Sequence, residues 1–519
     1  MPLPTDDTTH GAPTRRDADH RADAAVGSVD FIRRHGLWTD EQHAAAEEIV
    51  ARVAAEDLRA VRVNTADPHG KLRGKTVLAP LVGAVLRNGI DFVTAPFYFD
   101  TADGIVYNPF VAGGGLGDPR LNGFPDVVMV PDPLTFTTLP WAPRTGWCLG
   151  ATYFNDGTPV PFDGRHHLRR QLDALQQRFG LGYLVGLEVE FYLTRLVDVP
   201  LALDTLGGPG NPAAPPQVTP IAPGYAYQSE DHQDQIDGVL AALADNLMGA
   251  GLPLRTMEDE WGPGQCEFTF SPLPGLAAAD AMLLFRSATK QVARRLGLHA
   301  TFMCRPGLPS FYASGWHLHQ SLVDAGGANT FATPPGSDQV LSATGHRFVA
   351  GLLEHADAAS VFTTPTLNGY RRRTPFSLAP DRSTWGVDNR AAMLRVQGAP
   401  GDPSTHVENR VGEPAANPYL FLTSQLIAGM DGLTRELDPG EPEATPYAAE
   451  HRPLLPKTLM EAVEALRGSA LYRGALGDDV VDWLLGLKDF EIKRFTEAEG
   501  TWDPENVSDW EHREYFAQY

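Results

Sequence analysis

The sequence predicts an α+β protein, with a small, mainly β domain followed by a larger domain of mixed helices and strands. The segment VRVNTADPHGKLRGKTV (61–77) has two β-type runs around a turn that contains Pro and Gly, and it indicates a hairpin. Apolar residues at a helical spacing predict a helix over residues 168–179. After it, GLEVEF (186–191) alternates apolar and acidic residues, which is typical of a strand with one polar face.

The expected elements follow one another along the chain. The leader, residues 1–27, lacks the apolar core of a signal peptide, and we expect it to be disordered. Helix-like stretches and then short strands fill residues 28–148, the expected N-terminal domain. The mixed pattern continues through residues 149–519, the expected second domain. Within it, a segment rich in Pro and Gly (204–224) is interpreted as a surface loop.

The composition is that of a folded protein with a sizeable core, since 43% of the 519 residues are hydrophobic and 21% are charged. The formal net charge of −23 argues against nucleic acid or an anionic membrane as a partner, because no basic cluster offsets it. No apolar run approaches the roughly 20 residues that a membrane helix needs. Three widely separated cysteines indicate neither a disulfide framework nor a metal site, and they fit a cytoplasmic location.

Polar residues recur on other strand-like runs in the same alternation as in GLEVEF, where Glu188 and Glu190 share a face. The other members are His317, His319 and Ser321 in SGWHLHQSL, Glu408 and Arg410 in HVENR, and Glu260 and Glu267 around the turn of EWGPGQCEF. Together they suggest one cavity lined by carboxylates. Because burying a single unpaired ion costs several kcal/mol, we expect a cation among them. Oxygen ligands with one imidazole favour Mg²⁺ or Mn²⁺ over zinc.

The segment 368–396, which is interrupted by Pro and Gly, contributes Arg371, Arg372, Arg390 and Arg395. Their planar groups can clamp phosphate or carboxylate, and arginines with paired cations can hold a triphosphate. No GxxxxGK[ST] loop is present, and the glycine cluster at 113–117 lacks a strand-then-helix context. Each motif alone also fits a simpler interpretation: a solvated strand face, a structural histidine, a surface ion pair or a packing aromatic. Their occurrence together favours a site.

In this order the motifs resemble those of the glutamine synthetase superfamily: GLEVEF, EWGPGQCEF, GWHLHQSL, NGYRR, VDNR and VENRVGEPAANPYL follow the hairpin NTADPHGKLRGK. The resemblance spans residues 61–433. It implies an N-terminal β-grasp domain and a catalytic domain whose antiparallel strands form a split β-barrel with surrounding helices. It also implies a homo-oligomer, with rings of six subunits that commonly stack as dodecamers and active sites between neighbouring subunits.

The resemblance also implies roles for individual residues. One metal site would use Glu190, Glu260 and Glu267, and the other would use Glu188, His317 and Glu408, with two to three Mg²⁺ or Mn²⁺ ions in all. The implied phosphate and nucleotide contacts are His319, Ser321, Arg390 and Arg395. The implied contacts to substrate carboxylates are Arg372 and Arg410, and the implied catalytic residues are Glu260, Arg372 and Arg390. The reaction implied is amide formation with ATP, in which a carboxylate attacks the γ-phosphate and a nitrogen nucleophile then displaces phosphate.

Departures from the family pattern lie where ammonium would bind. An Asp and a Ser that hold ammonium in the family align with Val93 and Pro96, and the glutamate that deprotonates ammonium aligns with Leu378. Tyr225 keeps the aromatic position of this pocket, and Glu260 is its only matched carboxylate. An ammonium ion would therefore meet apolar side chains, which favours an amine with an apolar group.

Two further departures concern the other substrates. Tyr312 and Ala313 replace an Asn-Gly pair at the amino-acid end of glutamate, and His406 replaces an arginine that contacts ATP. We therefore expect Tyr312 near the acid substrate and His406 near the nucleotide.

From these observations we expect an ATP-dependent ligase that joins a carboxylate, taken as the γ-carboxylate of glutamate, to an organic amine. Its partners would be small-molecule acid and amine substrates. One alternative is an ammonia-dependent glutamine synthetase with a rearranged ammonium site, in which Asp91 or Asp100 substitutes for the missing groups. Another is a catalytically silent ring-forming scaffold or regulator, which would have no reason to keep a costly cluster of carboxylates.

Overall fold

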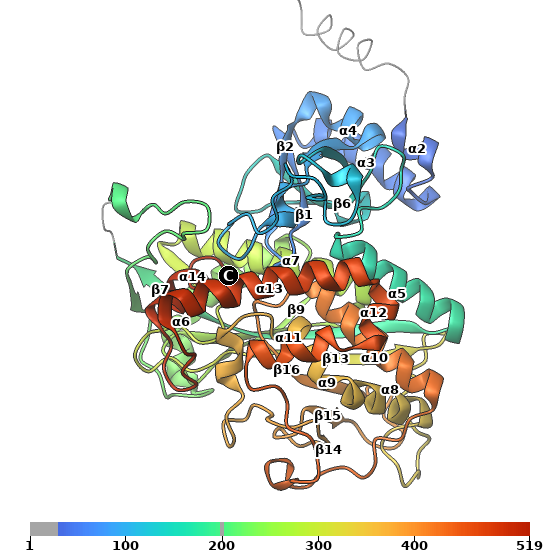
Figure 1. The fold of residues 1–519 in the computed structure, drawn as a ribbon, viewed down its shortest axis with the longest axis vertical. Helices are drawn as coiled ribbons and strands as arrows, with labels where there is room; N and C mark the ends of the chain where they lie inside the picture. Colours follow the sequence, from blue (N-terminus) through green and yellow to red (C-terminus); the bar gives the residue numbers. More distant parts are fainter. Residues whose placement is uncertain (1–29, 198–201) are drawn as a thin grey trace, which may run out of the picture.

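A computed structural model describes residues 30–197 and 202–519, and the predicted leader, residues 1–27, lies outside them. Two β-sheets organise the described chain (Figure 1). The N-terminal sheet lies at the top of Figure 1, above a larger body formed by the second sheet and most of the helices. In the part of the chain that is described, no helix combines the length and apolar character needed to cross a membrane.

The N-terminal sheet has six strands in the order β2-β1-β6-β4-β3, with β5 also paired to β6. Strands β1 and β6 run parallel, whereas the other pairs are antiparallel. The elements of this region are α2 (Phe31–His35), α3 (Asp40–Ala55), β1 (Ala60–Ala66), β2 (Leu72–Leu78), α4 (Val82–Asn88), β3 (Ile90–Val93), the 3-10 helix η2 (Ala95–Tyr98), β4 (Asp126–Pro131), β5 (Thr137–Thr138) and β6 (Thr145–Tyr153).

The predicted hairpin is confirmed, since β1 and β2 pair along their full length. Its turn depends on the buried Asp67, whose carboxylate accepts hydrogen bonds from the backbone N–H groups of His69 and Lys71 at 3.0 and 2.9 Å. Gly70 completes the turn with a φ of 72°, a conformation that residues with a side chain rarely adopt.

Strand β6 crosses the predicted limit between the two domains at 148–149. Its first half pairs with β1, where Cys148 lies opposite Val63, and its second half pairs with β4, where Ala151 lies opposite Val130. Residues on both sides of the limit therefore belong to one strand of the N-terminal sheet. The division into 28–148 and 149–519 stays a prediction, as does the description of the first domain as a β-grasp.

The second sheet has ten strands and is nearly closed on itself, like a barrel that is split along one side. Its path is β14-β15-β16-β13-β7-β10-β9, and β8, β11 and β12 also pair with β7. Only the pairing of β14 with β15 is parallel among its described strands. The strands are β7 (Gly182–Leu196), β8 (Val218–Pro220), β9 (Leu254–Asp259), β10 (Gln265–Phe270), β11 (Leu273–Pro274), β12 (Leu298–Thr301), β13 (Trp316–Val323), β14 (Trp385–Val387), β15 (Leu394–Gln397) and β16 (His406–Gly412).

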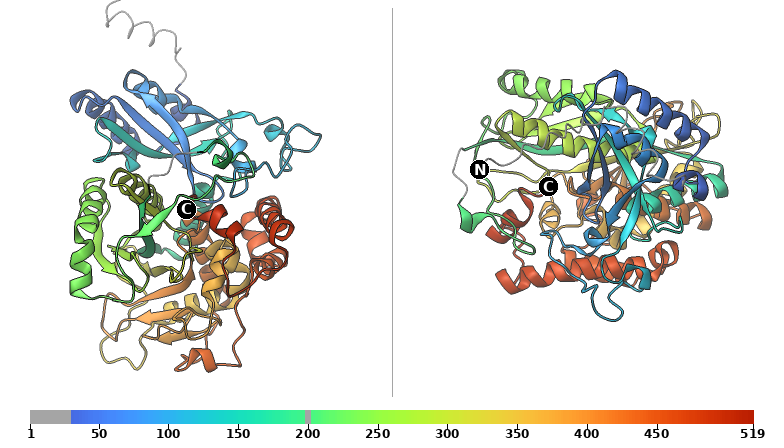
Figure 2. Two further views of the ribbon diagram at one scale, coloured as in Figure 1. Left: turned by 90° about the vertical axis from the view of Figure 1, so that its left-hand side faces the viewer. Right: turned by 90° about the horizontal axis from the view of Figure 1, so that it is seen from above.

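Helices surround this sheet, with α6 and α7 (green) and the C-terminal helices (red) on opposite sides of the molecule (Figure 2). They are α5 (Gly164–Phe179), α6 (Glu230–Gly249), α7 (Gly275–Arg295), α8 (Ala343–Glu354), α9 (Ala356–Thr363), the 3-10 helix η6 (Asn368–Arg372), α10 (Pro418–Arg435), α11 (Leu459–Arg467), α12 (Ala470–Leu476), α13 (Asp478–Glu499) and α14 (Asp509–Tyr515).

The helix predicted over residues 168–179 is confirmed as α5, which begins one turn earlier. The side chain of Asp163 accepts a hydrogen bond from the backbone N–H of Arg165 at 3.0 Å and so caps the first turn. Gly180, with a φ of 68°, ends the helix. In its apolar stripe, Leu168 and Leu175 are fully covered, and Leu172 and Phe179 are half-buried against the core.

The alternation in β7 separates a core face from a polar face. Leu187, Val189 and Phe191 are at most 2% exposed. The ring of Phe191 stacks on that of Phe302, with centroids 5.3 Å apart, and meets Phe268 edge-on at 5.2 Å. Because successive side chains of a strand point to opposite faces, Glu188 lies on the other side of the sheet from this aromatic core.

The segment 204–224, predicted to be a surface loop, is largely exposed but has specific contacts. The backbone N–H of Gly210 donates to the carbonyl oxygen of Ala102 in the N-terminal region at 3.0 Å. The carbonyl oxygen of Gly210 accepts from Arg494 of α13, also at 3.0 Å. This segment therefore joins the N-terminal region to the C-terminal helices.

Candidate active site

Strand register brings acidic and imidazole side chains into adjacent rows. Glu190 of β7 pairs with Glu267 of β10, and Glu267 pairs in turn with Glu258 of β9. Two residues back along β7, Glu188 pairs with His317 of β13. Paired residues of antiparallel strands place their Cβ atoms about 5 Å apart on one face. These residues therefore converge on a single surface, which we call the acidic surface.

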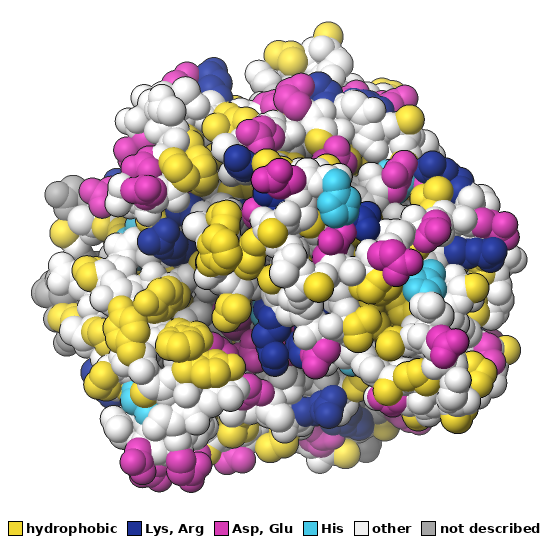
Figure 3. Space-filling view, turned by 90° about the horizontal axis from the view of Figure 1, so that it is seen from below, with side chains coloured by type: hydrophobic (Ala, Val, Ile, Leu, Met, Phe, Trp, Pro, Cys, Tyr) yellow, Lys and Arg dark blue, Asp and Glu magenta, His cyan; other side chains and the backbone are white. Residues whose placement is uncertain are grey.

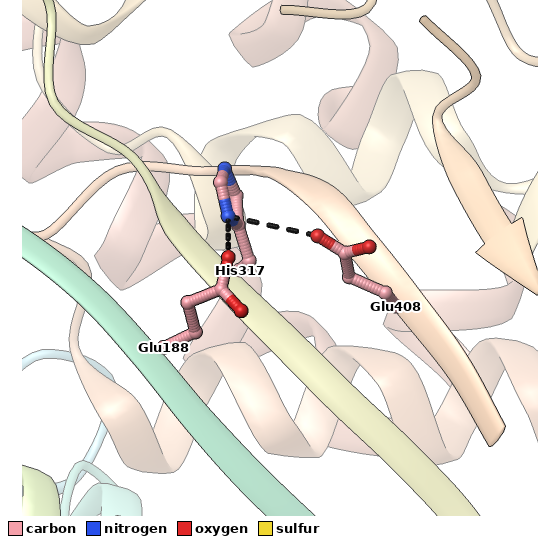
Figure 4. Close-up of side chains that lie close together, drawn as sticks. All are labelled: Glu188, His317 and Glu408. Carbon is pink, nitrogen blue, oxygen red and sulfur yellow. Dashed lines mark hydrogen bonds and ion pairs between the residues drawn. The ribbon is translucent and has the colours of Figure 1, made fainter. Parts of the chain in front are cut away.

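His317 lies near the centre of the acidic surface. Its Nδ1 is 2.6 Å from Oε1 of Glu188 and 3.6 Å from Oε1 of Glu408, and its Nε2 is 3.9 Å from Oε1 of Glu190. Figure 4 shows Glu188, His317 and Glu408 pointing toward one another from three neighbouring strands. The ligand-type atoms of these three residues lie within 4.8 Å of one another. They are the set implied by the sequence for one metal ion.

The second implied set is divided between two groups that meet the same 4.8 Å limit. One group contains Glu190, Glu267 and His317, and the other contains Glu258, Glu260 and Glu267. All three predicted carboxylates are therefore present, joined by Glu258, which the sequence analysis missed. The alternation of RTMEDEW, in which Glu258 and Glu260 share a face, is the signal that could have identified it.

On one side of the acidic surface the carboxylates are compensated by hydrogen bonds from histidines and by the charge of an arginine. Burial opposes ionisation of Glu188, but hydrogen bonds from His317 and His319 lower its pKa. Burial likewise opposes ionisation of Glu408, but the charge of Arg410 lowers the pKa of Glu408 to about 2. Both glutamates are therefore held in the charged form by the chain itself.

On the other side the carboxylates lack such compensation. Burial, followed by the charge of Glu190, raises the pKa of Glu260 to about 8. Burial, followed by the charges of Glu188 and Glu190, raises the pKa of Glu267 well above its usual value. A divalent cation would remove this repulsion, and carboxylate oxygens with one imidazole fit Mg²⁺ or Mn²⁺. The residues therefore fit the implied metal ions, and the demand for a cation is strongest at Glu260 and Glu267.

Arg372 and Arg410 approach the acidic surface from the side of His317. Arg372 donates from Nη2 to Nε2 of His317 at 2.9 Å and from Nη1 to the carbonyl oxygen of Arg410 at 2.6 Å. A Cβ at Gly315 would lie 2.4 Å from the guanidinium of Arg372, so this approach requires glycine. Arg410 forms an ion pair with Glu408. Burial lowers the pKa of Arg372, and the charge of Glu190 opposes this shift.

The other two predicted arginines lie beyond Glu408. Arg395 of β15 donates from Nη1 to Oε2 of Glu408 at 3.1 Å and also pairs with Asp388. Arg390 is exposed and lines a surface pocket together with Asp388 and Glu443. The structure thus places Arg395 against the acidic surface and Arg390 at its margin.

The residues expected to contact nucleotide continue along β13. Nε2 of His319 is 3.0 Å from Oε2 of Glu188, and its Nδ1 is 3.0 Å from Nε2 of His406. Ser321 follows on the same face of the strand and is buried. The structure therefore brings His319 and His406 together beside Glu188, with Ser321 next in the row.

Exposed aromatic rings lie beside the carboxylates. The backbone N–H of Tyr225 donates to the carbonyl oxygen of Trp261 at 2.8 Å. The ring of Tyr227 stacks on that of Trp261, with centroids 5.1 Å apart and planes 8° from parallel. Tyr225 meets Tyr312 edge-on at 5.7 Å. The four residues are between 43% and 55% exposed, and Trp261 directly follows Glu260 in the chain.

Tyr225 and Tyr312 were expected at the site from the sequence, whereas Tyr227 and Trp261 were not. Burial, followed by the charges of Glu260 and Glu267, raises the pKa of Tyr227, so its hydroxyl group lies within the field of the acidic surface. The face of the molecule seen from below shows basic and acidic side chains meeting near its middle, with hydrophobic groups beside them (Figure 3). The charged residues are therefore bordered by apolar surface.

The three apolar residues that replace the ammonium ligands lie in different places. Leu378 is 53% exposed, and its carbonyl oxygen accepts a hydrogen bond from Arg410 at 3.4 Å. Val93 ends β3 and is exposed, whereas Pro96 is buried in η2. Val93 and Pro96 belong to the N-terminal region at the top of Figure 1, and Leu378 belongs to the larger body.

Comparisons with known proteins identify chains that are similar to this one. The family model for the catalytic domain of glutamine synthetase matches residues 161–514. A gamma-glutamylanilide synthase of Acinetobacter sp is 45% identical over 94% of this chain and 99% of its own length. A gamma-glutamylethanolamide synthetase of Streptomyces coelicolor is 30% identical over 91% of this chain and 96% of its own length. A solved structure described as a GmaS/ADP complex is 25% identical, with a TM-score of 0.70, and the match covers 89% of this chain and 98% of that one.

Proposed function

The chain belongs to the glutamine synthetase family, and on this premise we propose that it is an ATP-dependent carbon–nitrogen ligase that joins the γ-carboxylate of glutamate to an organic amine. The similarity to a gamma-glutamylanilide synthase and to a gamma-glutamylethanolamide synthetase supports glutamate as the acid and an amine as the nitrogen donor. The reaction would transfer the γ-phosphoryl group of ATP to the carboxylate. The amine nitrogen would then displace phosphate from the acyl phosphate.

One observation supports this proposal most directly. A group of buried carboxylates that demands a cation lies near exposed aromatic rings. Burial, followed by the charges of Glu260 and Glu267, raises the pKa of Tyr227, and the ring of Tyr227 stacks on that of Trp261. A carboxylate at the end of an aromatic surface suits a molecule with a polar amine at one end and an apolar group at the other. We therefore assign the aromatic rings to the amine substrate and Glu260 to acceptance of a proton from its nitrogen.

The other residues divide between the remaining substrates. Divalent ions, Mg²⁺ or Mn²⁺, would be held by Glu188, Glu190, Glu260, Glu267, His317 and Glu408. When bound, they supply charge stabilisation for phosphoryl transfer. Arg372 and Arg410 would bind carboxylates of the acid. The nucleotide and its phosphates would be contacted by His319, Ser321, Arg390, Arg395 and His406.

The test of this function is an assay of phosphate release with ATP and Mg²⁺. Glutamate and other dicarboxylic acids are each combined with a panel of primary amines, and the amide product is identified by mass spectrometry. We expect phosphate release that depends on both glutamate and an amine, with one amide formed for each phosphate. Release that needs glutamate but no nitrogen donor, or no release with any pair, would contradict the proposal.

The aromatic rings should determine which amines react. Replacing Tyr227 or Trp261 with alanine should lower kcat/KM for aniline about tenfold, because a ring-to-ring contact and part of the buried apolar area are lost. The constant for ethylamine, whose apolar group is smaller, should fall less than that for aniline, and the constant for glutamate serves as the control within the same variant. Equal losses for aniline and ethylamine would show that the rings do not select the amine.

We further propose that the active site is shared between neighbouring subunits of a ring. Val93 and Pro96 align with residues of the ammonium site but lie in the N-terminal region, which suits delivery by an adjacent chain. The protein should therefore have the mass of a hexamer or larger by light scattering. A monomer with full activity would contradict the proposal.

Mixed assemblies can test the sharing directly. Val93→Arg damages only the surface that a subunit contributes to the active site of its neighbour. Glu267→Ala damages only the acidic surface in the subunit's own active site. Co-expression of these two inactive variants should restore activity on the order of a quarter of the wild-type value, because randomly mixed rings contain intact pairs at that frequency. No recovery in mixed rings of normal size would contradict shared sites.

A further inference from the structure

The two adjacent arginines of η6 point in opposite directions. Arg372 reaches the acidic surface, where it contacts His317 and the carbonyl oxygen of Arg410. Arg371 reaches away from it to the C-terminal helix α14, where it meets Glu511. One short segment therefore links the candidate site for the acid substrate to the end of the chain.

Glu511 holds η6 at two points. Its Oε1 accepts from Nε of Arg371 at 2.8 Å, and Nη2 of Arg371 pairs with its other oxygen. The same Oε1 accepts from Nδ2 of Asn368 at 3.2 Å. Asn368 and Arg371 are the first and fourth of the five residues of η6. The carboxylate of Glu511 thus spans most of the length of this 3-10 helix.

These contacts are protected from water. Glu511 and Asn368 are fully buried and Arg371 is 4% exposed. The guanidinium of Arg371 also lies over the ring of Trp502, 4.8 Å from its centroid. Separating a buried ion pair leaves an unpaired charge at a cost of several kcal/mol, so η6 and α14 must move together.

Arg372 differs from Arg371 in forming no ion pair with a carboxylate of the described chain. Across residues 30–197 and 202–519, no carboxylate forms an ion pair with Arg372, although it is only 9% exposed. Its guanidinium is held by a neutral carbonyl oxygen and an imidazole nitrogen. The nearest acidic influence is the charge of Glu190, which acts on Arg372 without forming an ion pair. A buried guanidinium without an ion-pair partner is suited to bind an anion from outside the chain.

We propose that Glu511 is a positioning residue that holds Arg372 at the angle needed to bind a carboxylate of the acid substrate, acting through Arg371 and Asn368. This inference rests on the proposed function, because that function supplies the carboxylate. A bidentate arginine–carboxylate contact depends on direction as well as distance, so a small rotation of η6 weakens it. The C-terminal helix α14 is then part of the machinery that determines the affinity for the acid.

Two glutamate-to-glutamine substitutions in α14 can be compared as a test and its matched control. Glu511→Gln keeps the shape of the side chain but removes the charge that holds Arg371. Glu514→Gln makes the same change one turn further along α14, where the buried Glu514 pairs with Arg494 and does not contact η6. Both changes disturb a buried ion pair of the same helix, so both should lower the melting temperature to a similar degree.

Only Glu511→Gln should change recognition of the acid. We expect the KM of this variant for glutamate to rise about tenfold and its KM for ATP to stay unchanged. The reason is that a displaced Arg372 loses most of its contact with the carboxylate of the acid. Glu514→Gln should leave both constants within about twofold of the wild type. An equal rise in the KM for glutamate in the two variants would assign Glu511 a merely structural role and overturn the proposal.

A second comparison tests whether Glu511 acts through Arg372. In an Arg372→Lys background the forked contact is already absent, so adding Glu511→Gln should not raise the KM for glutamate further. Additive effects would overturn the proposal. If Glu511→Gln does not fold, Arg371→Lys keeps the buried charge pair but loses its fork, and an unchanged KM for glutamate in that variant would also overturn it. A wild-type protein without glutamate-dependent turnover would instead refute the proposed function.

Discussion

Replacing Glu190 or Glu267 with alanine should reduce ATP-dependent turnover by about three orders of magnitude, which corresponds to about 4 kcal/mol of lost transition-state stabilisation. Both residues belong to a group whose ligand-type atoms lie within 4.8 Å of one another together with His317. Removing either one takes away a ligand and changes the net charge of the remaining group. The measurement is kcat for phosphate release at saturating ATP, glutamate and amine. Near-normal activity in either variant would contradict a site built on divalent cations.

The stability of the metal-free protein provides the control for this prediction. Because burial and neighbouring carboxylates raise the pKa of Glu267, its ionised form destabilises the folded protein when no cation is present. Glu267→Gln, which should lose turnover like the alanine variants, should therefore be at least as stable as the wild type in EDTA. The wild type should gain about 2.7 kcal/mol from Mg²⁺ at a hundred times its dissociation constant, and the variant should gain less. A variant that is unstable in EDTA would indicate that lost activity reflects unfolding.

Ammonium should be a poor substrate compared with primary amines that carry an alkyl or aryl group. An ammonium ion needs several oxygen acceptors to replace its hydration, and the aligned positions Val93, Pro96 and Leu378 offer no such side chains. An apolar group would instead gain from the exposed aromatic rings. Burial of roughly 100 Å² at about 25 cal/mol per Å² gives about 2.5 kcal/mol, nearly two orders of magnitude in kcat/KM.

Competition experiments test this preference. Ammonium and a series of primary amines of increasing apolar size are supplied at equal concentration, and the amide products are quantified together. The amount of amide product should increase with the apolar size of the amine until the amine is too large to fit beside the aromatic rings. If ammonium gives the highest kcat/KM, the alternative of a glutamine synthetase with a rearranged ammonium site replaces the amine ligase. The Leu378→Glu variant, which restores the aligned carboxylate, should shift the ratio toward ammonium.

The alternative of a catalytically silent scaffold is contradicted by the comparisons. The matching family model describes a catalytic domain, and the two relatives are named as a synthase and a synthetase. The carboxylates also remain buried and mutually repulsive at Glu260 and Glu267, an arrangement that stabilises the fold only when a cation is bound.

The amino-acid sequence by itself determined much of the local structure around the second sheet. The period-two pattern in β7 separates Glu188 and Glu190 from the aromatic core because strand geometry alone assigns alternate residues to opposite faces. Asp163 caps the beginning of α5 and Gly180 ends it, and both effects depend only on residues within a few positions of each helix end. The need for a cation also follows from the sequence, since any fold that gathers these carboxylates must neutralise them.

The tertiary structure decided which of these groups meet, because local patterns specify a face but not the register between distant strands. Pairing of β9 with β10 adds Glu258 to the acidic surface, and pairing of β15 with β16 sets Arg395 against Glu408. The sequence placed Arg371 and Arg372 in one motif. Packing of α14 separated their roles, because the buried carboxylate of Glu511 forms an ion pair with Arg371, whereas Arg372 forms no ion pair in the described chain.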